Sequence, residues 1–166
     1  MNATEWDEKV AAVWASAARL SDEDVVKAIG ALAAQRPPDD AAALYERASA
    51  FDYAGREAEA EPLYRAALAA GLDGRRRAEA AIQLASTLRS LGRAAESVDL
   101  LRAEIAARHA DGLADARAAF LALALVDADR STEAVAEALT ALARHLTDYR
   151  RAVTHYADEL RTRANP

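Results

Sequence analysis

The side chains best suited to catalysis in this chain are its three histidines, His109, His145 and His155. None lies in an HExxH pattern or at another metal-ligand spacing, and none accompanies a nucleophile motif. His155 with Asp158 and Tyr149 is the most polar grouping, but a half-exposed histidine on a helix usually has no catalytic role. The chain has no cysteine, which excludes thiolate chemistry and disulfides. We therefore expect no enzyme activity, no cofactor and no bound metal.

Two arginine clusters could bind anions. Arg75, Arg76 and Arg77 form the denser one and could hold a phosphate or an acidic peptide, although such a run before a helix is more often a solvated loop end. Arg150 and Arg151 form the second cluster. With 21 basic and 27 acidic residues, the chain has a net charge of -6, which argues against nucleic acid or a membrane surface as a partner.

The elements that position these side chains must be helices. Alanine is by far the commonest residue, and alanine, leucine, arginine and glutamate are the best helix formers. Strand-forming residues never alternate with polar ones over a useful length. The longest apolar run, at 118–126, is too short for a bilayer, and the acidic amino-terminal segment is unlike a secretory signal. We expect one all-α domain in the cytoplasm.

Apolar residues at helical spacing, together with glycine, proline and capping residues, predict about nine helices. Residues 1–36 form a first helix pair, with Ser21 as an N-cap and Pro37 and Pro38 as the break after it. The register of this pair to the later segments is poor. We interpret it as an amino-terminal cap, and a degenerate repeat is the alternative.

Three further helix pairs are expected at about 39–74, 75–111 and 112–145, and a carboxyl-terminal capping helix at 146–163. The capping helix carries an apolar face made of Leu146, Tyr149, Val153, Tyr156 and Leu160. This face is predicted to pack on the last pair.

One turn recurs at a fixed spacing. Gly55, Gly92 and Asp129 are each 37 residues apart, and each follows a predicted helix, where glycine adopts the left-handed conformation without strain and aspartate is a tolerable substitute. An arginine follows each turn residue, with a glutamate three positions after it: Arg56 and Glu59, Arg93 and Glu96, Arg130 and Glu133. Small residues also recur (Ala48, Ala85 and Ala122), as do large ones (Phe51, Leu88 and Leu125). These features predict stacked helix pairs with a continuous core.

This layout resembles the tetratricopeptide repeat, in which large, small and aromatic positions alternate over two helices. The first copy matches with Leu44, Ala48, Phe51, Ala60 and Tyr64, and the second with Leu84, Ala85, Leu88, Ser97 and Leu101. The third copy has Leu121, Ala122, Leu125 and Ala134, but Ala138 replaces a bulky residue. The period exceeds the usual ~34 residues, and the terminal proline is missing.

From about 39 to 163 the chain is similar to the group-5 tetratricopeptide-repeat family of short bacterial proteins, because of its GRxxEA-type turns and the YRR of its terminal helix. The resemblance implies a right-handed α-α superhelix of antiparallel helix pairs and a role in protein association, with a suspected tendency to dimerise. It does not identify a partner.

In the tetratricopeptide repeat, the first helix of each pair lines a concave groove. The resemblance implies that the groove residues here are Tyr45, Ser49, Asp52 and Tyr53, then Ile82, Ser86, Arg89 and Ser90, then Ala119, Leu123 and Val126. Tyrosine and arginine often dominate the energetics of binding. The alternative is that the tyrosines pack internally and the serines only avoid crowding.

Leu123 and Val126 would form an apolar patch that a soluble protein rarely leaves exposed. Either the terminal helix covers it through Tyr149, Val153 and Tyr156, or a second copy of the chain does. We therefore predict a protein-interaction module that binds a peptide or helix in its groove. The alternative is a homodimer whose groove is occupied by the partner subunit, and an enzyme would need chemistry that the sequence does not display.

Overall fold

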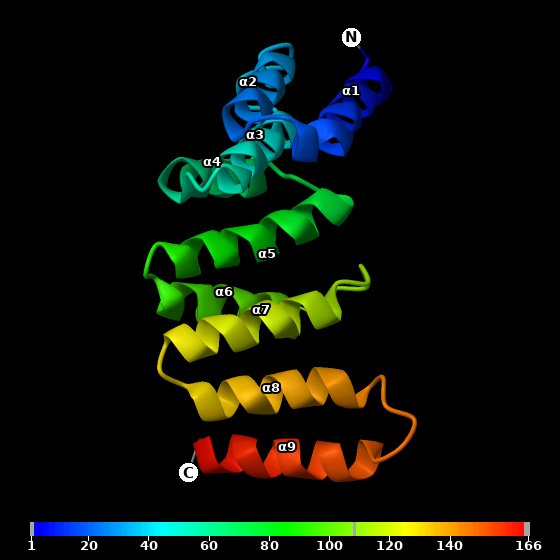
Figure 1. Cartoon of the computed structure of the whole chain (residues 1–166), viewed down its shortest axis with the longest axis vertical. Helices are drawn as coiled ribbons and strands as arrows, with labels where there is room; N and C mark the ends of the chain where they lie inside the picture. Colours follow the sequence, from blue (N-terminus) through cyan, green and yellow to red (C-terminus); the bar gives the residue numbers. More distant parts are fainter. Residues whose placement is uncertain (1, 108, 165–166) are drawn as a thin grey trace. The chain divides into compact units, whose positions relative to one another are not determined.

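The computed structural model describes residues 2–107 and 109–164, and within them it contains nine α-helices, one short 3-10 helix and no strand (Figure 1). The predicted all-α class is confirmed. No helix among these residues is both long enough and apolar enough to cross a bilayer. The helices are α1 (Ala3–Ser16), α2 (Asp22–Ala33), α3 (Ala41–Tyr53), α4 (Glu57–Ala69), α5 (Gly74–Ser90), α6 (Ala94–Ala106), α7 (Ala114–Asp127), α8 (Ser131–Ala143) and α9 (Arg150–Ala164), and the 3-10 helix is Ala17–Arg19.

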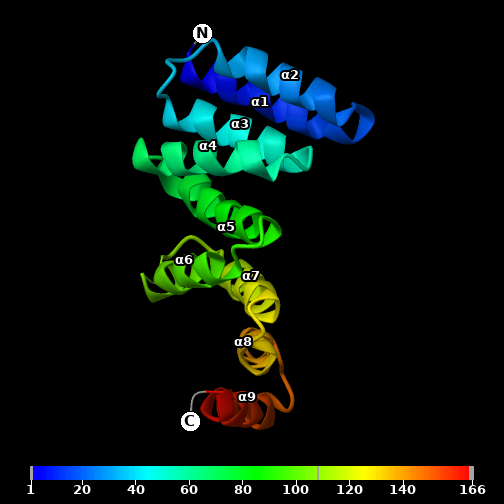
Figure 2. The ribbon, with the colours of Figure 1, turned by 90° about the vertical axis from the view of Figure 1, so that its left-hand side faces the viewer.

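The helices form two compact units, one ending at Thr87 and the other beginning at Leu88, so the boundary lies within α5. In the amino-terminal unit, α2 packs against α1 and α3, and α3 packs against α4. In the carboxyl-terminal unit, α7 packs against α6 and α8, and α8 packs against α9 (Figures 1 and 2). Helices that are consecutive in the sequence are therefore neighbours in space within each unit.

Trp6 anchors the core of the amino-terminal unit. It is 1% exposed, its indole Nε1 donates a hydrogen bond of 2.9 Å to the carbonyl of Leu32, and the Arg36 guanidinium lies 5.2 Å from the ring centroid. The side chains that cluster with it come from α1, the 3-10 helix, α2 and α3: Val10, Ala17, Val25, Ile29, Ala33, Ala43 and Ala50. Removal of this apolar surface from water stabilises the first three helices as one block.

Ser21 caps α2 as predicted, and Asp40 caps α3. Ser21 Oγ accepts a hydrogen bond of 3.2 Å from the amide of Asp24, and Asp40 Oδ1 accepts one of 2.9 Å from the amide of Ala43. Each bond satisfies an amide that has no partner within its own helix. The starts of α2 and α3 are thus encoded locally.

The recurring turn has the predicted left-handed residue. The backbone φ is 67° at Gly55, 75° at Gly92 and 59° at Asp129. The amide of the next residue donates to the carbonyl five positions earlier, at 2.9 Å for Arg56 and Arg93 and 2.8 Å for Arg130. The amide of each turn residue donates to the carbonyl three positions earlier at 3.0 to 3.1 Å. This pair of bonds is the Schellman arrangement, which satisfies the last carbonyls of a helix.

The arginine after each turn fixes the start of the next helix. Arg93 Nε and NH2 donate to the two carboxylate oxygens of Glu96 at 2.6 and 2.7 Å. Arg130 binds Glu133 in the same way at 2.6 and 2.8 Å, and Arg56 binds Glu59 through the same two nitrogens. These ion pairs tie the turn residue's neighbour to the first turn of the following helix in all three copies.

The small and large repeat positions pack with one exception in each set. Ala48 and Ala85 are fully buried, and so are Leu88 and Leu125, whereas Ala122 and Phe51 are half-buried. Close approach of two helices requires a small residue at their contact, and the large residues fill the space beside it. The repeat is therefore most regular in its second copy.

The terminal helix departs from its predicted extent and face. It begins at Arg150, and Tyr149 lies outside it with a φ of 60° and 83% of its surface exposed. Within α9, Ala157 is fully buried and Tyr156 is 58% exposed. The predicted face was wrong at both tyrosines, because the small side chain of Ala157 lets α9 lie close to α8 and turns Tyr156 outward.

Candidate functional site

Among the predicted groove residues, Tyr45 of α3 packs inside the amino-terminal unit. It is 6% exposed, its hydroxyl donates to Glu79 Oε2 at 3.2 Å, and its ring centroid lies 6.3 Å from that of Tyr64. Burial, with a smaller effect from the Glu79 charge, raises the pKa of Tyr45. The phenol is therefore a neutral donor that fixes α3 to α5, in line with the alternative of internal packing.

Ser49 and Asp52 belong to a hydrogen-bond network that joins α3, α4 and α5. Ser49 Oγ donates to Gln83 Oε1 at 3.3 Å, and the Tyr64 hydroxyl lies 3.5 Å from Ser49 Oγ and 3.2 Å from Asp52 Oδ2. The Thr87 hydroxyl donates to Asp52 Oδ1 at 3.1 Å. Burial raises the pKa of Asp52, although the two hydroxyl donors oppose that shift. These polar groups satisfy one another, which is the condition for keeping them out of water.

Tyr53 is the accessible aromatic residue of α3. It is 47% exposed, and its ring meets that of Trp14 edge to face, with centroids 5.9 Å apart. Trp14 Nε1 donates to Glu46 Oε2 at 2.8 Å. Trp14 was not among the predicted residues, although it follows the core residue Val10 by one helical step of four residues. Of the predicted residues of α5 that belong to this unit, Ile82 is buried and Ser86 is half-buried.

The arginine run at 75–77 is engaged within the chain. Arg76 Nε donates to Glu46 Oε1 at 3.2 Å and its NH2 donates to Asp7 Oδ1 at 2.7 Å, while the guanidinium lies 5.8 Å from the ring centroid of Trp6. The two flanking arginines also interact with other residues of the protein. This run joins α5 to α1 and α3, and it presents no cluster of free cations to an anion.

The carboxyl-terminal unit exposes the apolar residues predicted on α7. Leu123 is 48% exposed, Val126 is 50% exposed, and Ala119 is exposed one turn before them. Their spacing of four and three places them on one face of the helix, and we call these three residues the α7 strip. Arg89 NH1 donates to Asp127 Oδ2 at 2.9 Å beside this strip. Arg89 Nε has no hydrogen-bond partner within the residues that the structure describes.

The terminal helix does not cover the α7 strip within one chain. It packs against α8 (Figure 1), and Leu123 and Val126 remain half-exposed. Ser90, the last residue of α5, is exposed as well. Of the two predicted covers, a second copy of the chain stays a prediction.

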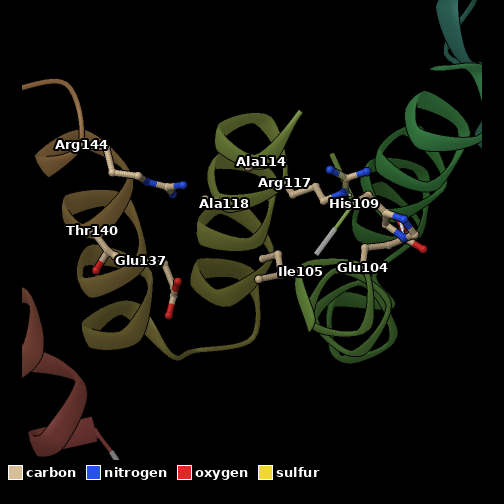
Figure 3. Close-up of a pocket in the computed structure, with 9 residues that line it drawn as sticks. All are labelled: Glu104, Ile105, His109, Ala114, Arg117, Ala118, Glu137, Thr140 and Arg144. Atoms are coloured by element: carbon tan, nitrogen blue, oxygen red, sulfur yellow. Dashed lines mark ion pairs between the residues drawn. The ribbon is translucent and has the colours of Figure 1, made fainter. Parts of the chain in front are cut away.

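A hollow of about 400 Å³ opens over Ala114 and Ala118 of α7 (Figure 3). Its other lining residues come from α6 and the loop after it and from α7 and α8: Glu104, Ile105, His109, Arg117, Glu137, Thr140 and Arg144. Arg117 is 2% exposed and donates to Asp111 Oδ1 at 2.9 Å, and it holds the pKa of Asp111 well below its usual range. Charges of opposite sign compensate one another around this hollow. It contains none of the predicted groove residues.

Each of the three histidines lies near an acidic residue that belongs to a helix. His109 lies 3.6 Å from Glu104, His145 lies 2.8 Å from Asp115 and His155 lies 3.4 Å from Glu159. His155 thus pairs with Glu159, whereas Asp158 was expected beside it, because residues four apart face each other on a helix. Within residues 2–107 and 109–164, no three metal-ligating side chains cluster.

A group-5 family model described as Tetratrico peptide repeat matches residues 41–160 of this chain. The match begins with α3 and includes the recurring turns and most of α9. No curated protein and no solved structure matches the chain.

Proposed function

Because the chain belongs to the tetratricopeptide-repeat family, whose members generally mediate protein–protein interactions, we propose that it is a non-catalytic module that binds a peptide or a helix of another protein. In this proposal the chain consists of an amino-terminal cap at 1–36, three helix pairs over 39–145 and a terminal cap at 146–163. The first helix of each pair forms the binding side.

The observation that carries this proposal is the exposed α7 strip. Full burial of a leucine or valine side chain contributes about 1.5 to 3 kcal/mol, so covering the exposed halves of Leu123 and Val126 would contribute about 1 kcal/mol each. A partner with apolar side chains at helical spacing gains this free energy. Arg89 lies beside the strip, where its ion pair with Asp127 (2.9 Å) adds a polar edge to the apolar face.

The first copy has a different role in the proposal. Tyr45, Ser49 and Asp52 use their polar atoms within the chain, so they hold the binding helices in place. Tyr53, with 47% of its surface exposed, supplies an aromatic contact to the partner. Ser86 and Ser90 are accessible enough to add hydrogen bonds.

The second candidate function is a homodimer in which the other subunit occupies the same face. The exposed Tyr149 and Tyr156 favour it, since they add aromatic area to the apolar surface of the carboxyl-terminal unit. A symmetric pair would bury both the α7 strip and these rings without another protein.

Val126 and Val135 provide a matched test. They are 50% and 48% exposed, on α7 and α8 respectively. We expect Val126→Asp to abolish capture of the cognate partner from a lysate and Val135→Asp to leave it unchanged. Captured proteins are identified by mass spectrometry, and each variant is checked by circular dichroism. Equal capture by both variants would remove the α7 strip from the binding face.

Light scattering separates the two candidates. The interaction module is expected to be a monomer at tens of micromolar, with the mass unchanged by Val126→Asp. A dimer that Val126→Asp converts to a monomer would establish the homodimer as the function of this face.

A further inference from the structure

The groove between α2 and α3 has the features of a ligand site that is separate from the α7 strip. It has a volume of about 460 Å³ and lies in the amino-terminal unit, where the two helices run side by side (Figures 1 and 2). Its lining is mostly apolar and comes from α2, the loop after it and α3: Val26, Gly30, Ala33, Ala34, Arg36, Pro37, Pro38, Ala43, Leu44, Arg47 and Phe51. A volume of this size is within the range of small-molecule sites.

Gly30 lines the groove at a position where the fold itself does not require a glycine. It lies within α2, where glycine costs roughly 0.5–1 kcal/mol relative to alanine. Its φ is not positive, and a Cβ added to it would have no neighbour within 4 Å. Neither backbone conformation nor packing in this chain requires a glycine there. The missing side chain leaves room for a ligand to approach the backbone of α2.

Arg47 supplies a free positive charge beside the groove. It is exposed, and within residues 2–107 and 109–164 it makes no hydrogen bond or ion pair. Arg36, the other arginine of the lining, is already paired with Asp40 at 2.7 Å and lies over Trp6. The spare donors therefore belong to Arg47, which has the geometry to hold a carboxylate through two parallel hydrogen bonds.

The loop between the two helices contributes Pro37 and Pro38 to the lining of the groove, and proline restricts the backbone there. The groove thus combines an apolar lining with one cation, Arg47, that is unpaired within the described part of the chain, which suits a small ligand with an apolar body and a single negative charge. We propose that this groove binds a small amphiphile with an apolar body and a carboxylate head, such as a medium-chain fatty acid, with the body over Gly30 and the head on Arg47.

Decanoate is the probe, with decanol and decyltrimethylammonium as its neutral and cationic counterparts. Calorimetry on the full chain is expected to rank decanoate first, and Arg47→Gln should weaken decanoate about fivefold while leaving decanol unchanged. Trp6 gives a local signal, since it contacts Arg36, and the Trp14→Phe variant leaves it as the single tryptophan of the chain. Equal affinity for decanoate and decyltrimethylammonium would overturn the proposal.

Gly30 and its neighbour Ala31 give the matched steric test. Both lie on α2, but Ala31 is exposed and outside the groove. We expect Gly30→Leu to reduce decanoate binding at least tenfold and Ala31→Leu to leave it unchanged. Gly30→Ala should raise the midpoint of thermal unfolding and keep most of the decanoate binding. That result would separate an effect on the groove from an effect on the stability of the fold. Equal binding by the two leucine variants would refute the site.

Discussion

Asp129 stands where the first two recurring turns have glycine, and its replacement measures what that conformation costs. Its φ is 59°, and its carboxylate makes no hydrogen bond or ion pair in the part of the chain that the structure describes. An L-residue in the left-handed conformation costs about 1–2 kcal/mol, which glycine would recover. Glycine also raises the conformational entropy of the unfolded chain, and this reduces the gain in stability by about 0.4–1 kcal/mol. We expect Asp129→Gly to raise the free energy of unfolding by about 0.5–1 kcal/mol.

The charge of Asp129 contributes little to this difference, because it lies between the end of α7 and the start of α8, whose dipoles act on it with opposite sign. Urea unfolding followed by circular dichroism measures the effect. The reciprocal variant Gly92→Asp creates the same strain in the second turn, where φ is 75°, and should lower the free energy of unfolding by a similar amount. A less stable Asp129→Gly variant, or an unchanged Gly92→Asp variant, would contradict the reasoning.

Three other substitutions test the interior by urea unfolding. Asp111→Asn leaves the buried guanidinium of Arg117 without its main counter-charge and should cost about 3 kcal/mol at neutral pH. Arg117 lowers the pKa of Asp111 in the folded protein. The stability that this pair contributes is therefore complete above about pH 4 and is lost as the pH falls toward the folded-state pKa of Asp111. An Asp111→Asn variant that loses stability in acid as steeply as the wild type would contradict this. Tyr64→Phe removes a buried hydroxyl and should cost about 1–2 kcal/mol, whereas Tyr53→Phe, at an exposed position, should be neutral. Pro62→Ala restores a backbone donor inside α4 and should stabilise by about 1–3 kcal/mol; a neutral result would show that the helix already relaxes around the proline.

The recurring turns could be predicted from the sequence because their chemistry is local. A position with positive φ favours glycine, and Gly55 and Gly92 each lie two residues past the last residue of a helix. The arginine and glutamate that follow them are three residues apart, which is a neighbouring position on a helix. Ser21 as an N-cap was predictable for the same reason, since the amide that it binds is only three residues away.

The burial or exposure of individual groove residues could not be predicted, because it depends on residues far away in the sequence. Tyr45 can be buried because Glu79, 34 positions later, accepts a hydrogen bond from its hydroxyl. Helical spacing alone also placed Tyr149 in the terminal helix, but the helix begins only after the left-handed backbone of Tyr149. Periodicity identifies the sides of a helix, whereas tertiary contacts decide which side is covered.

Comparison of the three copies at the repeat spacing explains why apolar surface is exposed in the third copy. Ser49, Ser86 and Leu123 occupy one position of the repeat. Ser49 is 9% exposed and hydrogen-bonded to Gln83, whereas Leu123 is 48% exposed. A polar group leaves water without loss only when it has such a partner, so the first copy has little left to gain from binding. Leucine gains free energy from any apolar cover, so that gain is still available at the third copy, where the exposed strip lies.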